Sequence, residues 1–266
     1  MNETGLSFLD LLKTPADATP ISTLAGAWEA YQSKRNTGTS PFSSAVLVAS
    51  RVDRLGFAFA VGYPAALQHM VDRLVLPSAL CVTEASGNSP RSIESTLEKK
   101  GDGYELRGTK TFVTFGNLAK TLVVVAKVGH KSDGRPDLAV VRIPSDRAGV
   151  SLQELPETPF VPEVPHTSVR FDGVEVNAYE RLPGDGYLEY VKPFRTIEDI
   201  HVIGAALAYL MGLSRRTRSS KTLIAELSAD LSALDRLRDG HPLDPRVHIA
   251  LHGVHRRVMR LVGDPA

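Results

Sequence analysis

Disulfides and a strong charge bias are both missing from this sequence. Its 266 residues include a single cysteine, Cys81, which excludes an internal disulfide and is typical of a reducing compartment. The 31 basic and 30 acidic side chains nearly cancel, so the overall charge favours neither nucleic acid nor an anionic membrane. We therefore expect no nucleic-acid partner.

Long uninterrupted hydrophobic runs are missing as well. The most apolar region, residues 42–70, contains Arg51, Asp53 and Arg54, which argues against a membrane-spanning helix there. The first residues show neither the basic start nor the apolar core of a secretory signal. Hydrophobic residues still make up 42% of the chain, enough for a buried core. We expect a cytoplasmic globular protein of one large or two small domains, without a membrane partner.

The first part of the chain is helical in pattern. Across residues 1–79, apolar side chains recur at the spacing of one helix face, which predicts a short N-terminal helical domain. Ser22 is a candidate N-cap, because its hydroxyl is able to accept from a free backbone N–H group. Pro64 is expected at the first position of a further helix, where its missing N–H group does no harm.

The middle part, residues 80–182, changes to short runs rich in β-branched residues. Turn-forming pairs such as Asp102–Gly103, Asp133–Gly134 and Asp172–Gly173 separate these runs at regular intervals. Many short, evenly spaced strands predict an antiparallel β-barrel or sandwich. The run at residues 121–128 is apolar on both faces and is expected to be a central strand.

The last part, residues 183–266, returns to helical spacing. One helix is expected to close at Gly240, and the next to start behind Asp244. The predicted fold class is therefore α+β, with N-terminal helices, a middle antiparallel β-barrel and a C-terminal helical bundle.

Four motifs in order suggest a family. They are CVTEASGNS, the run KGDGYELRGTKTFVTFG, the strand VRFDGVEV and a GDG turn that enters a helix. Together they cover about residues 80–187 and resemble the acyl-CoA dehydrogenases, of which this chain looks like a shortened or divergent member. The resemblance implies that FAD and an acyl-CoA thioester bind between the β-domain and the bundle. It further implies electron-transfer flavoprotein as a partner, and a homo-oligomer or a hetero-oligomer with a homologue.

The resemblance also assigns candidate cofactor-binding residues. Thr83 would donate its hydroxyl to the isoalloxazine edge, and Ser89 would lie near the flavin and the thioester channel. Phe112 would cover one face of the ring system, and the Thr114 hydroxyl would reach N5 or the ribityl chain. Such donors help a reduced flavin to carry its charge. Glu84 would anchor the loop. The alternative is that these hydroxyls satisfy only loop backbone groups.

A candidate base follows from the same comparison. Glu198 matches the position at which some members carry the catalytic glutamate, ahead of the small residues Gly204 and Ala205. A buried carboxylate there would have a raised pKa, which suits removal of an α-proton from a thioester. The alternative is that Glu198 and Asp199 form a solvated pair in the first helical turn, favoured by the helix dipole. We predict no metal site.

Some residues depart from the family pattern. Asn88 and Pro90 replace residues that the family's loop usually has, and no R-x-x-F-G motif follows the first long helix of the bundle. In the family that motif contacts the FAD diphosphate and adenine. Arg215, Arg216 and Arg218 are either substitute phosphate binders or a solvated helix end.

These observations leave several functions open. The first is a flavin-dependent acyl-CoA dehydrogenase-like enzyme, which removes an α-proton and passes hydride to FAD. The second is a related subunit without FAD or catalysis, which acts as a binding or structural partner. A third is a flavin monooxygenase of the same fold.

Overall fold

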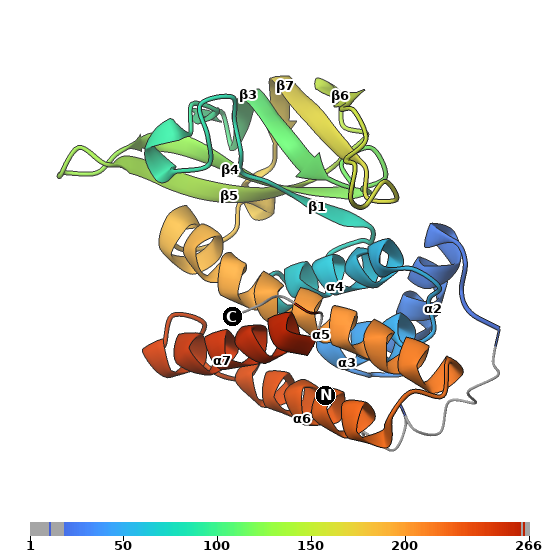
Figure 1. Cartoon of the computed structure of the whole chain (residues 1–266). Helices are drawn as coiled ribbons and strands as arrows, with labels where there is room; N and C mark the ends of the chain where they lie inside the picture. Colours follow the sequence, from blue (N-terminus) through green and yellow to red (C-terminus); the bar gives the residue numbers. More distant parts are fainter. Residues whose placement is uncertain (1–10, 12–18, 262, 264–266) are drawn as a thin grey trace. The chain divides into compact units, whose positions relative to one another are not determined.

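The computed structural model describes residues 11, 19–261 and 263. They form two compact units (Figure 1). One unit contains the described residues up to Met70 together with those from Phe194 onward. The other is the continuous segment Val71–Pro193, which holds all the strands of the sheet.

Six longer helices make up most of the helical part. Their bounds are α2 Leu24–Asn36, α3 Pro41–Ala49, α4 Leu55–Met70, α5 Lys192–Arg216, α6 Lys221–Leu237 and α7 Pro245–Leu261. Two sequence expectations about their ends change, and one is confirmed. Thr23 rather than Ser22 caps α2, accepting from the Gly26 N–H group at 3.1 Å. Helix α6 ends before Gly240, with Arg238 as its C-cap. Helix α7 does begin at Pro245, directly after Asp244.

Pro64 lies inside α4 and does not start a helix, so that expectation was wrong. The proline at the start of a helix is instead Pro41 of α3, where the Ser40 hydroxyl caps the helix by accepting from the Ser43 N–H group. A proline inside a helix leaves the carbonyl four residues earlier without its usual donor. Here the indole N–H group of Trp28 donates to that carbonyl, Ala60, at 2.8 Å. The substitute hydrogen bond explains how α4 tolerates the proline.

Helices α4 and α5 approach closely through a glycine. A Cβ atom added at Gly62 would lie 3.0 Å from Cβ of Ala205 and 3.1 Å from Cα of Val202. Gly204 of α5 similarly makes room for the ring of Phe42. The small-residue stretch of α5 therefore serves helix packing.

The arginines at the end of α5 contact backbone carbonyls. Arg215 donates to the Leu11 oxygen at 2.6 Å. Arg216 donates to the oxygens of Ser50 and Val52 at 3.2 and 3.1 Å. Only Arg218 is exposed, as a solvated helix end would be. Arg215 and Arg216 thus tie segments of the helical unit together.

One helical stretch is long and strongly apolar. Within the described residues, Gly186–Arg216 is the one helix long and apolar enough to cross a membrane by length and composition. Its most apolar part is 56% buried inside the structure, and core helices of soluble proteins share this length and composition. This stretch is weak evidence for a membrane span.

A mixed seven-stranded sheet forms the β unit. Its strands are β1 Ser78–Cys81, β2 Thr96–Lys100, β3 Gly103–Thr114, β4 Thr121–His130, β5 Pro136–Pro144, β6 Val150–Glu154 and β7 His166–Val176. The order is β1-β4-β2-β3-β7-β6, with β5 paired to β4. Most pairs are antiparallel, but β1 runs parallel to β4, and β2 meets β4 in parallel at Thr96 and Lys127. The expected purely antiparallel barrel is corrected to a mixed sheet.

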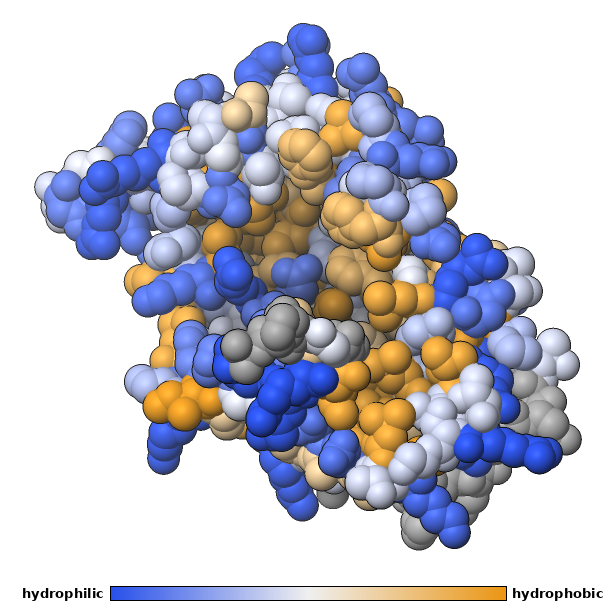
Figure 2. Space-filling view, in the orientation of Figure 1, coloured by the Kyte–Doolittle hydropathy of each residue, from blue (hydrophilic) through white to orange (hydrophobic). Residues whose placement is uncertain are grey.

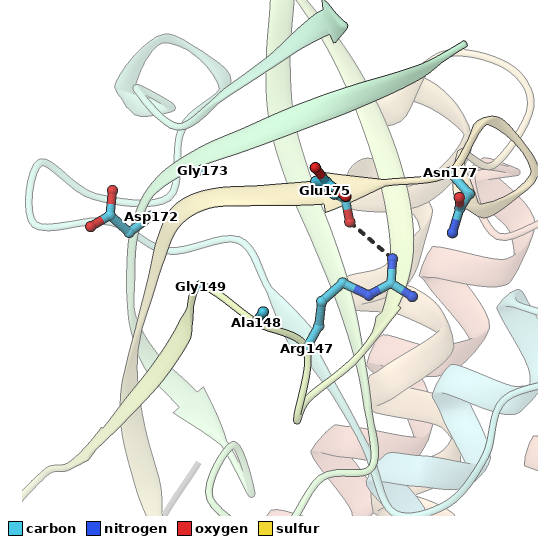
Figure 3. Close-up of a pocket in the computed structure, with 7 residues that line it drawn as sticks. All are labelled: Arg147, Ala148, Gly149, Asp172, Gly173, Glu175 and Asn177. Atoms are coloured by element: carbon cyan, nitrogen blue, oxygen red, sulfur yellow. Dashed lines mark hydrogen bonds between the residues drawn. The ribbon is translucent and has the colours of Figure 1, made fainter. Parts of the chain in front are cut away.

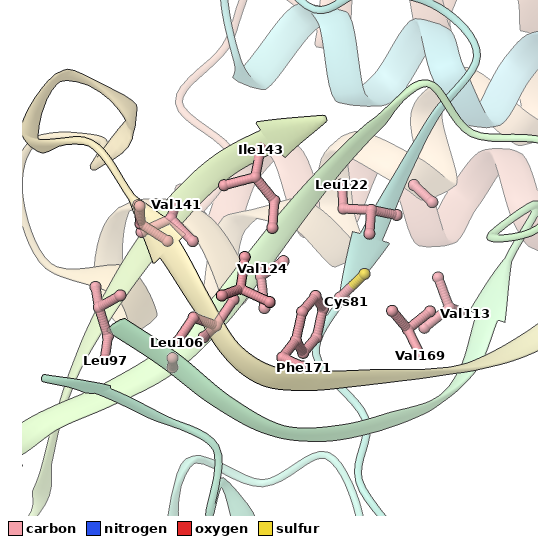
Figure 4. Packing of buried hydrophobic residues seen from close by; sticks show 14 of the residues in the cluster. Cys81, Leu97, Leu106, Val113, Leu122, Val124, Val141, Ile143, Val169 and Phe171 are labelled. Carbon is pink, nitrogen blue, oxygen red and sulfur yellow. The ribbon is translucent and has the colours of Figure 1, made fainter. Parts of the chain in front are cut away.

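The core of this unit lies on one face of the sheet. Figure 4 shows apolar side chains from several strands, among them Leu106, Leu122, Val141 and Phe171, pointing toward one another. Residues 121–126 of β4 are all buried, which confirms the prediction of a central strand. Cys81 lies in this core, and burial raises the pKa of its thiol to about 12, so it is not a reactive thiolate. By contrast, the surface seen in Figure 2 mixes hydrophilic and hydrophobic areas.

Candidate functional site

A β-bulge in β3 gives Phe112 an unusual backbone conformation. The antiparallel pairing of β3 and β7 shifts register between Lys110 and Val113. Inside this bulge Phe112 has φ of 51°, and its side chain is 64% exposed. A left-handed backbone is unfavourable for a bulky residue, and an exposed aromatic ring gains little from folding. Bulges that turn a side chain outward in this way are common beside functional sites.

The bulge also holds the loop between β1 and β2. The N–H group of Thr111 donates to the Thr83 carbonyl at 2.8 Å, which brings Thr83 beside Phe112. Thr114 ends β3 on the other side of the bulge, opposite His166 of β7. The structure thus brings together three residues predicted from the sequence, Thr83, Phe112 and Thr114.

His166 is a member of this site that the sequence did not reveal. Its ring packs edge-on against Phe112, with centroids 6.4 Å apart and planes at 67°. Nothing in the local sequence marks it, because its place depends on the register of β7 against a bulged strand. We call Thr83, Phe112, Thr114 and His166 the bulge site.

Glu84 anchors the loop, as expected. One carboxylate oxygen accepts from the Glu94 N–H group at 2.8 Å, and the other from Ser95 N–H at 3.1 Å and from the Lys110 ammonium at 2.7 Å. Burial alone would raise the pKa of Glu84, but Lys110 and the two N–H groups outweigh it and lower the pKa. The carboxylate is therefore ionised and holds both ends of the loop.

Lys110 is the second residue that sequence reasoning missed. Its side chain is completely buried under the loop, where its ammonium also donates to the Val82 carbonyl at 3.2 Å. Burial lowers the pKa of Lys110, and the contact with Glu84 partly restores it. Since β3 alternates inward and outward residues, an inward lysine signals a buried ionic partner.

Ser89 lies in a different setting from the bulge site. Its hydroxyl shares a hydrogen bond with that of Ser92 at 2.8 Å, within the loop. It lines a pocket of about 310 Å³ together with its neighbours in the loop and residues from two other segments. These are Pro90, Arg91, Lys131, Arg135, Pro136, Tyr187 and Leu188, and we call the whole the basic pocket.

Positive charge exceeds negative charge around the basic pocket. Lys131 pairs with Asp185, whose carboxylate also accepts from two N–H groups at the start of the π-helical turn Gly186–Val191. Arg135 pairs with Asp133 at 2.5 Å. Arg91 makes no ion pair with any residue that the structure describes. A cationic pocket with one aromatic and several apolar walls suits an anionic ligand with a hydrophobic part.

In a second pocket of the β unit, the one arginine is engaged by contacts within the protein. This pocket measures about 470 Å³ and is lined by Arg147, Gly149, Asp172, Gly173 and their neighbours (Figure 3). Figure 3 shows Arg147 reaching toward Glu175, whose carbonyl it bonds at 2.9 Å. The same guanidinium also binds the Glu180 carboxylate at 2.6 and 2.8 Å. Because Arg147 is already paired within the protein, we interpret this pocket as structural.

Glu198 lies in the second turn of α5, and no acidic residue occupies the first turn. The expected alternative of a solvated first-turn pair is therefore wrong, because the helix starts earlier than the sequence suggested. Burial and the charge of Asp199 raise the pKa of Glu198 to about 7, while Arg195 opposes the shift. Such a carboxylate is able to take up and release a proton near neutral pH.

Asp199 lines a separate pocket of about 390 Å³ within the helical unit. Arg195, His248, His252 and His255 also face it. Across the described residues, no group of three or more His, Cys, Asp or Glu side chains is arranged to hold a metal ion.

The chain is similar to several known proteins. Residues 79–174 match the family model of the acyl-CoA dehydrogenase middle domain. The chain is 28% identical over 159 residues to benzylmalonyl-CoA dehydrogenase of Aromatoleum aromaticum, covering 55% of this chain and 39% of that protein. It is 26% identical over 151 residues to 3-sulfinopropanoyl-CoA desulfinase of Paraburkholderia xenovorans, covering 55% and 38%. The chain thus spans about two fifths of the length of these curated relatives.

Solved structures share the fold over most of the chain. A FAD-dependent dehydrogenase matches with a TM-score of 0.64 and 17% identity, covering 87% of this chain and 76% of that one. Butyryl-CoA dehydrogenase of Megasphaera elsdenii matches at 0.55 and 16%, covering 91% and 70%. These likenesses confirm the α+β class. Residues 79–174 are thus similar to the acyl-CoA dehydrogenase middle domain, and the chain as a whole has the fold of these solved structures.

Proposed function

We propose that this protein is a flavin-dependent, acyl-CoA dehydrogenase-like oxidoreductase that binds FAD at the bulge site. The observation that carries the proposal is the bulge itself, which holds an exposed, strained Phe112 two residues before Thr114 and next to Thr111, whose N–H group is bonded to Thr83. These residues fit a flavin, because the aromatic ring offers an apolar face and the hydroxyls offer hydrogen bonds. When bound, FAD would supply the two-electron acceptor that the chain's own side chains lack.

The basic pocket supports an acyl-CoA thioester as the substrate. Coenzyme A carries several phosphate charges, and Arg91, Lys131 and Arg135 supply cations. Tyr187 and Leu188 provide an apolar wall for the less polar pantetheine part. Ser89 lies in the same loop as Thr83, so one segment would serve both ligands. The acyl group itself is left open.

Glu198 is the proposed base. A base for an α-proton must be unprotonated when it acts and basic enough to hold the proton afterwards. A carboxyl group with a pKa of about 7 meets both needs near neutral pH. In this proposal Glu198 removes the α-proton of the thioester as the β-hydrogen leaves with its electron pair. The family resemblance further suggests electron-transfer flavoprotein as acceptor, an oligomer and a cytoplasmic location.

A second candidate function is a subunit that binds without FAD. One observation favours it. The R-x-x-F-G motif is missing, and the nearby Arg215 and Arg216 are committed to backbone carbonyls. These two side chains are therefore poor substitutes for the phosphate contacts that the family motif makes.

The absorbance spectrum of the purified chain, recorded before and during addition of FAD, tests the proposal. We expect flavin bands that stay with the protein through gel filtration. Thr83→Val and Phe112→Ala should weaken FAD binding. Thr109→Val should leave FAD binding unchanged, because it alters an exposed threonine earlier in the same strand, before the bulge. If the wild-type chain, mixed with saturating FAD, carries no flavin bands after gel filtration, the enzyme proposal is rejected and the binding subunit is favoured.

A further inference from the structure

We propose that His166 is a further ligand-contacting residue, whose imidazole hydrogen-bonds the flavin held at the bulge site. The inference rests on the proposed function and assigns a role to a residue that the sequence did not single out. It starts from the place of His166 at the first position of β7, directly opposite Thr114.

The backbone of His166 is fixed on both sides. Its carbonyl accepts from the Leu155 N–H group at 2.9 Å, next to β6. Across from it, β3 pairs at Thr114 and Val113 beyond the bulge. The pairing of the strands therefore places the imidazole beside Phe112. The edge-on contact, with ring centroids 6.4 Å apart, follows from that placement.

Nδ1 of His166 is left without a hydrogen-bond partner by the described part of the protein. This atom is buried. The backbone of Val164 lies near the ring and acts to raise the pKa of His166, but no hydrogen bond joins it to Nδ1. A buried polar atom without a partner costs free energy, and native structures keep few of them. A ligand that offers hydrogen-bonding groups beside Phe112 would remove this cost.

The protonation state of His166 suits such a ligand. Burial lowers the pKa of His166, so the imidazole is neutral at physiological pH. A neutral imidazole carries one donor and one acceptor. The flavin ring system likewise carries carbonyl oxygens and ring nitrogens along its polar edge, while its faces are apolar. Phe112 would cover a face, and Thr114 and His166 would supply the polar contacts.

The competing explanation is that His166 only packs against Phe112. Two substitutions separate the explanations. His166→Phe keeps an aromatic ring on Phe112 but removes both nitrogens, whereas His166→Gln restores a donor and an acceptor. The matched control is His130→Gln, which changes an exposed histidine at the end of β4 in the same unit.

The experiment combines FAD titration with histidine NMR on the full chain. We expect His166→Phe to weaken FAD binding about tenfold, the effect of one lost hydrogen bond, with His166→Gln between it and the wild type. His130→Gln should bind as the wild type does. In the wild-type chain, FAD should shift the imidazole signals of His166 and leave those of His130 in place.

Each outcome decides the inference. If FAD binds equally to the wild type and His166→Phe, and the His166 signals stay in place, this inference is overturned while the proposed function stands. If the wild type takes up no FAD, both are overturned. The NMR arm uses the wild-type chain, so it decides the question even if His166→Phe fails to fold.

Discussion

The ammonium of Lys110 lies 2.7 Å from a carboxylate oxygen of Glu84, and both side chains are buried. This ion pair fastens the loop that carries Thr83 and Ser89 to the strand that carries Phe112. Replacing one partner leaves the other charge buried and unpaired, which in other proteins costs about 3–5 kcal/mol. We expect Lys110→Met to lower the free energy of unfolding by about that amount, measured by urea denaturation.

A double-mutant cycle checks the reason for this loss. Lys110→Met combined with Glu84→Gln should be more stable than Lys110→Met alone, because no uncompensated charge then remains. Arg107→Met removes a solvent-exposed partner of Glu105 on the same strand, and it should cost far less than Lys110→Met. Equal losses for Lys110→Met and Arg107→Met would contradict the buried-pair interpretation.

Phe112 and Phe115 provide a matched test of backbone strain. Both have positive φ, 51° and 58°, but Phe112 is 64% exposed whereas Phe115 is 1% exposed. Asparagine tolerates this backbone better than phenylalanine. We expect Phe112→Asn to leave stability unchanged or raise it by up to about 1 kcal/mol, while FAD binding weakens. Phe115→Asn should instead lose about 3–5 kcal/mol of stability. Thermal unfolding and FAD titration of both variants measure the contrast.

The basic pocket predicts a salt-dependent affinity for coenzyme A. Arg91→Ala and Arg135→Ala should each weaken binding roughly tenfold, because each removes a charged donor to phosphate. Arg170→Ala, which removes an exposed arginine of β7 outside this pocket, is the control. Calorimetry at two salt concentrations gives the affinities. Equal weakening by Arg170→Ala would point to a non-specific charge effect.

Glu198 should make stability fall as pH rises. Its folded pKa of about 7 lies above the ordinary value of about 4.3, so the folded chain holds this proton more tightly than the unfolded chain. The contribution is complete below about pH 4 and is lost as pH rises through about 7. Glu198→Gln should therefore be more stable than the wild type at pH 8 but not at pH 5.

Urea midpoints at the two pH values measure this difference. Glu226→Gln, an exposed change on α6, should have the same effect at both. A Glu198→Gln variant that shifts stability equally at pH 5 and pH 8 would show that the carboxyl group is ionised in the folded chain.

The strands illustrate what local sequence is able to predict. The alternation in β3, β5 and β7 and the continuous apolar run of β4 indicated strands that the structure contains. The short strands β1 and β2 were not predicted, because four or five residues carry little periodicity. Parallel pairing of β1 with β4 joins Ser78 to Thr121, and no local pattern reports a partner so far along the chain.

The candidate site divides in the same way. Motif resemblance pointed to Thr83, Phe112 and Thr114, which the fold brings together. It did not reveal His166, which reaches Phe112 only through strand register across a bulge. Nor did it predict that Ser89 lines the basic pocket, which depends on where the β4–β5 hairpin and the turn at Tyr187 fold.

The helical unit is assembled from two stretches of chain that flank the β unit. Gly62 of α4 packs against Ala205 and Val202 of α5, yet the ribosome synthesises all of Val71–Pro193 after α4 and before most of α5. At synthesis rates of roughly 5–20 residues per second, the ribosome needs on the order of ten seconds to cover that interval. During this time the apolar face of α4 has no α5 to cover it. A newly made chain is therefore expected to need protection of that face by a chaperone until α5 emerges.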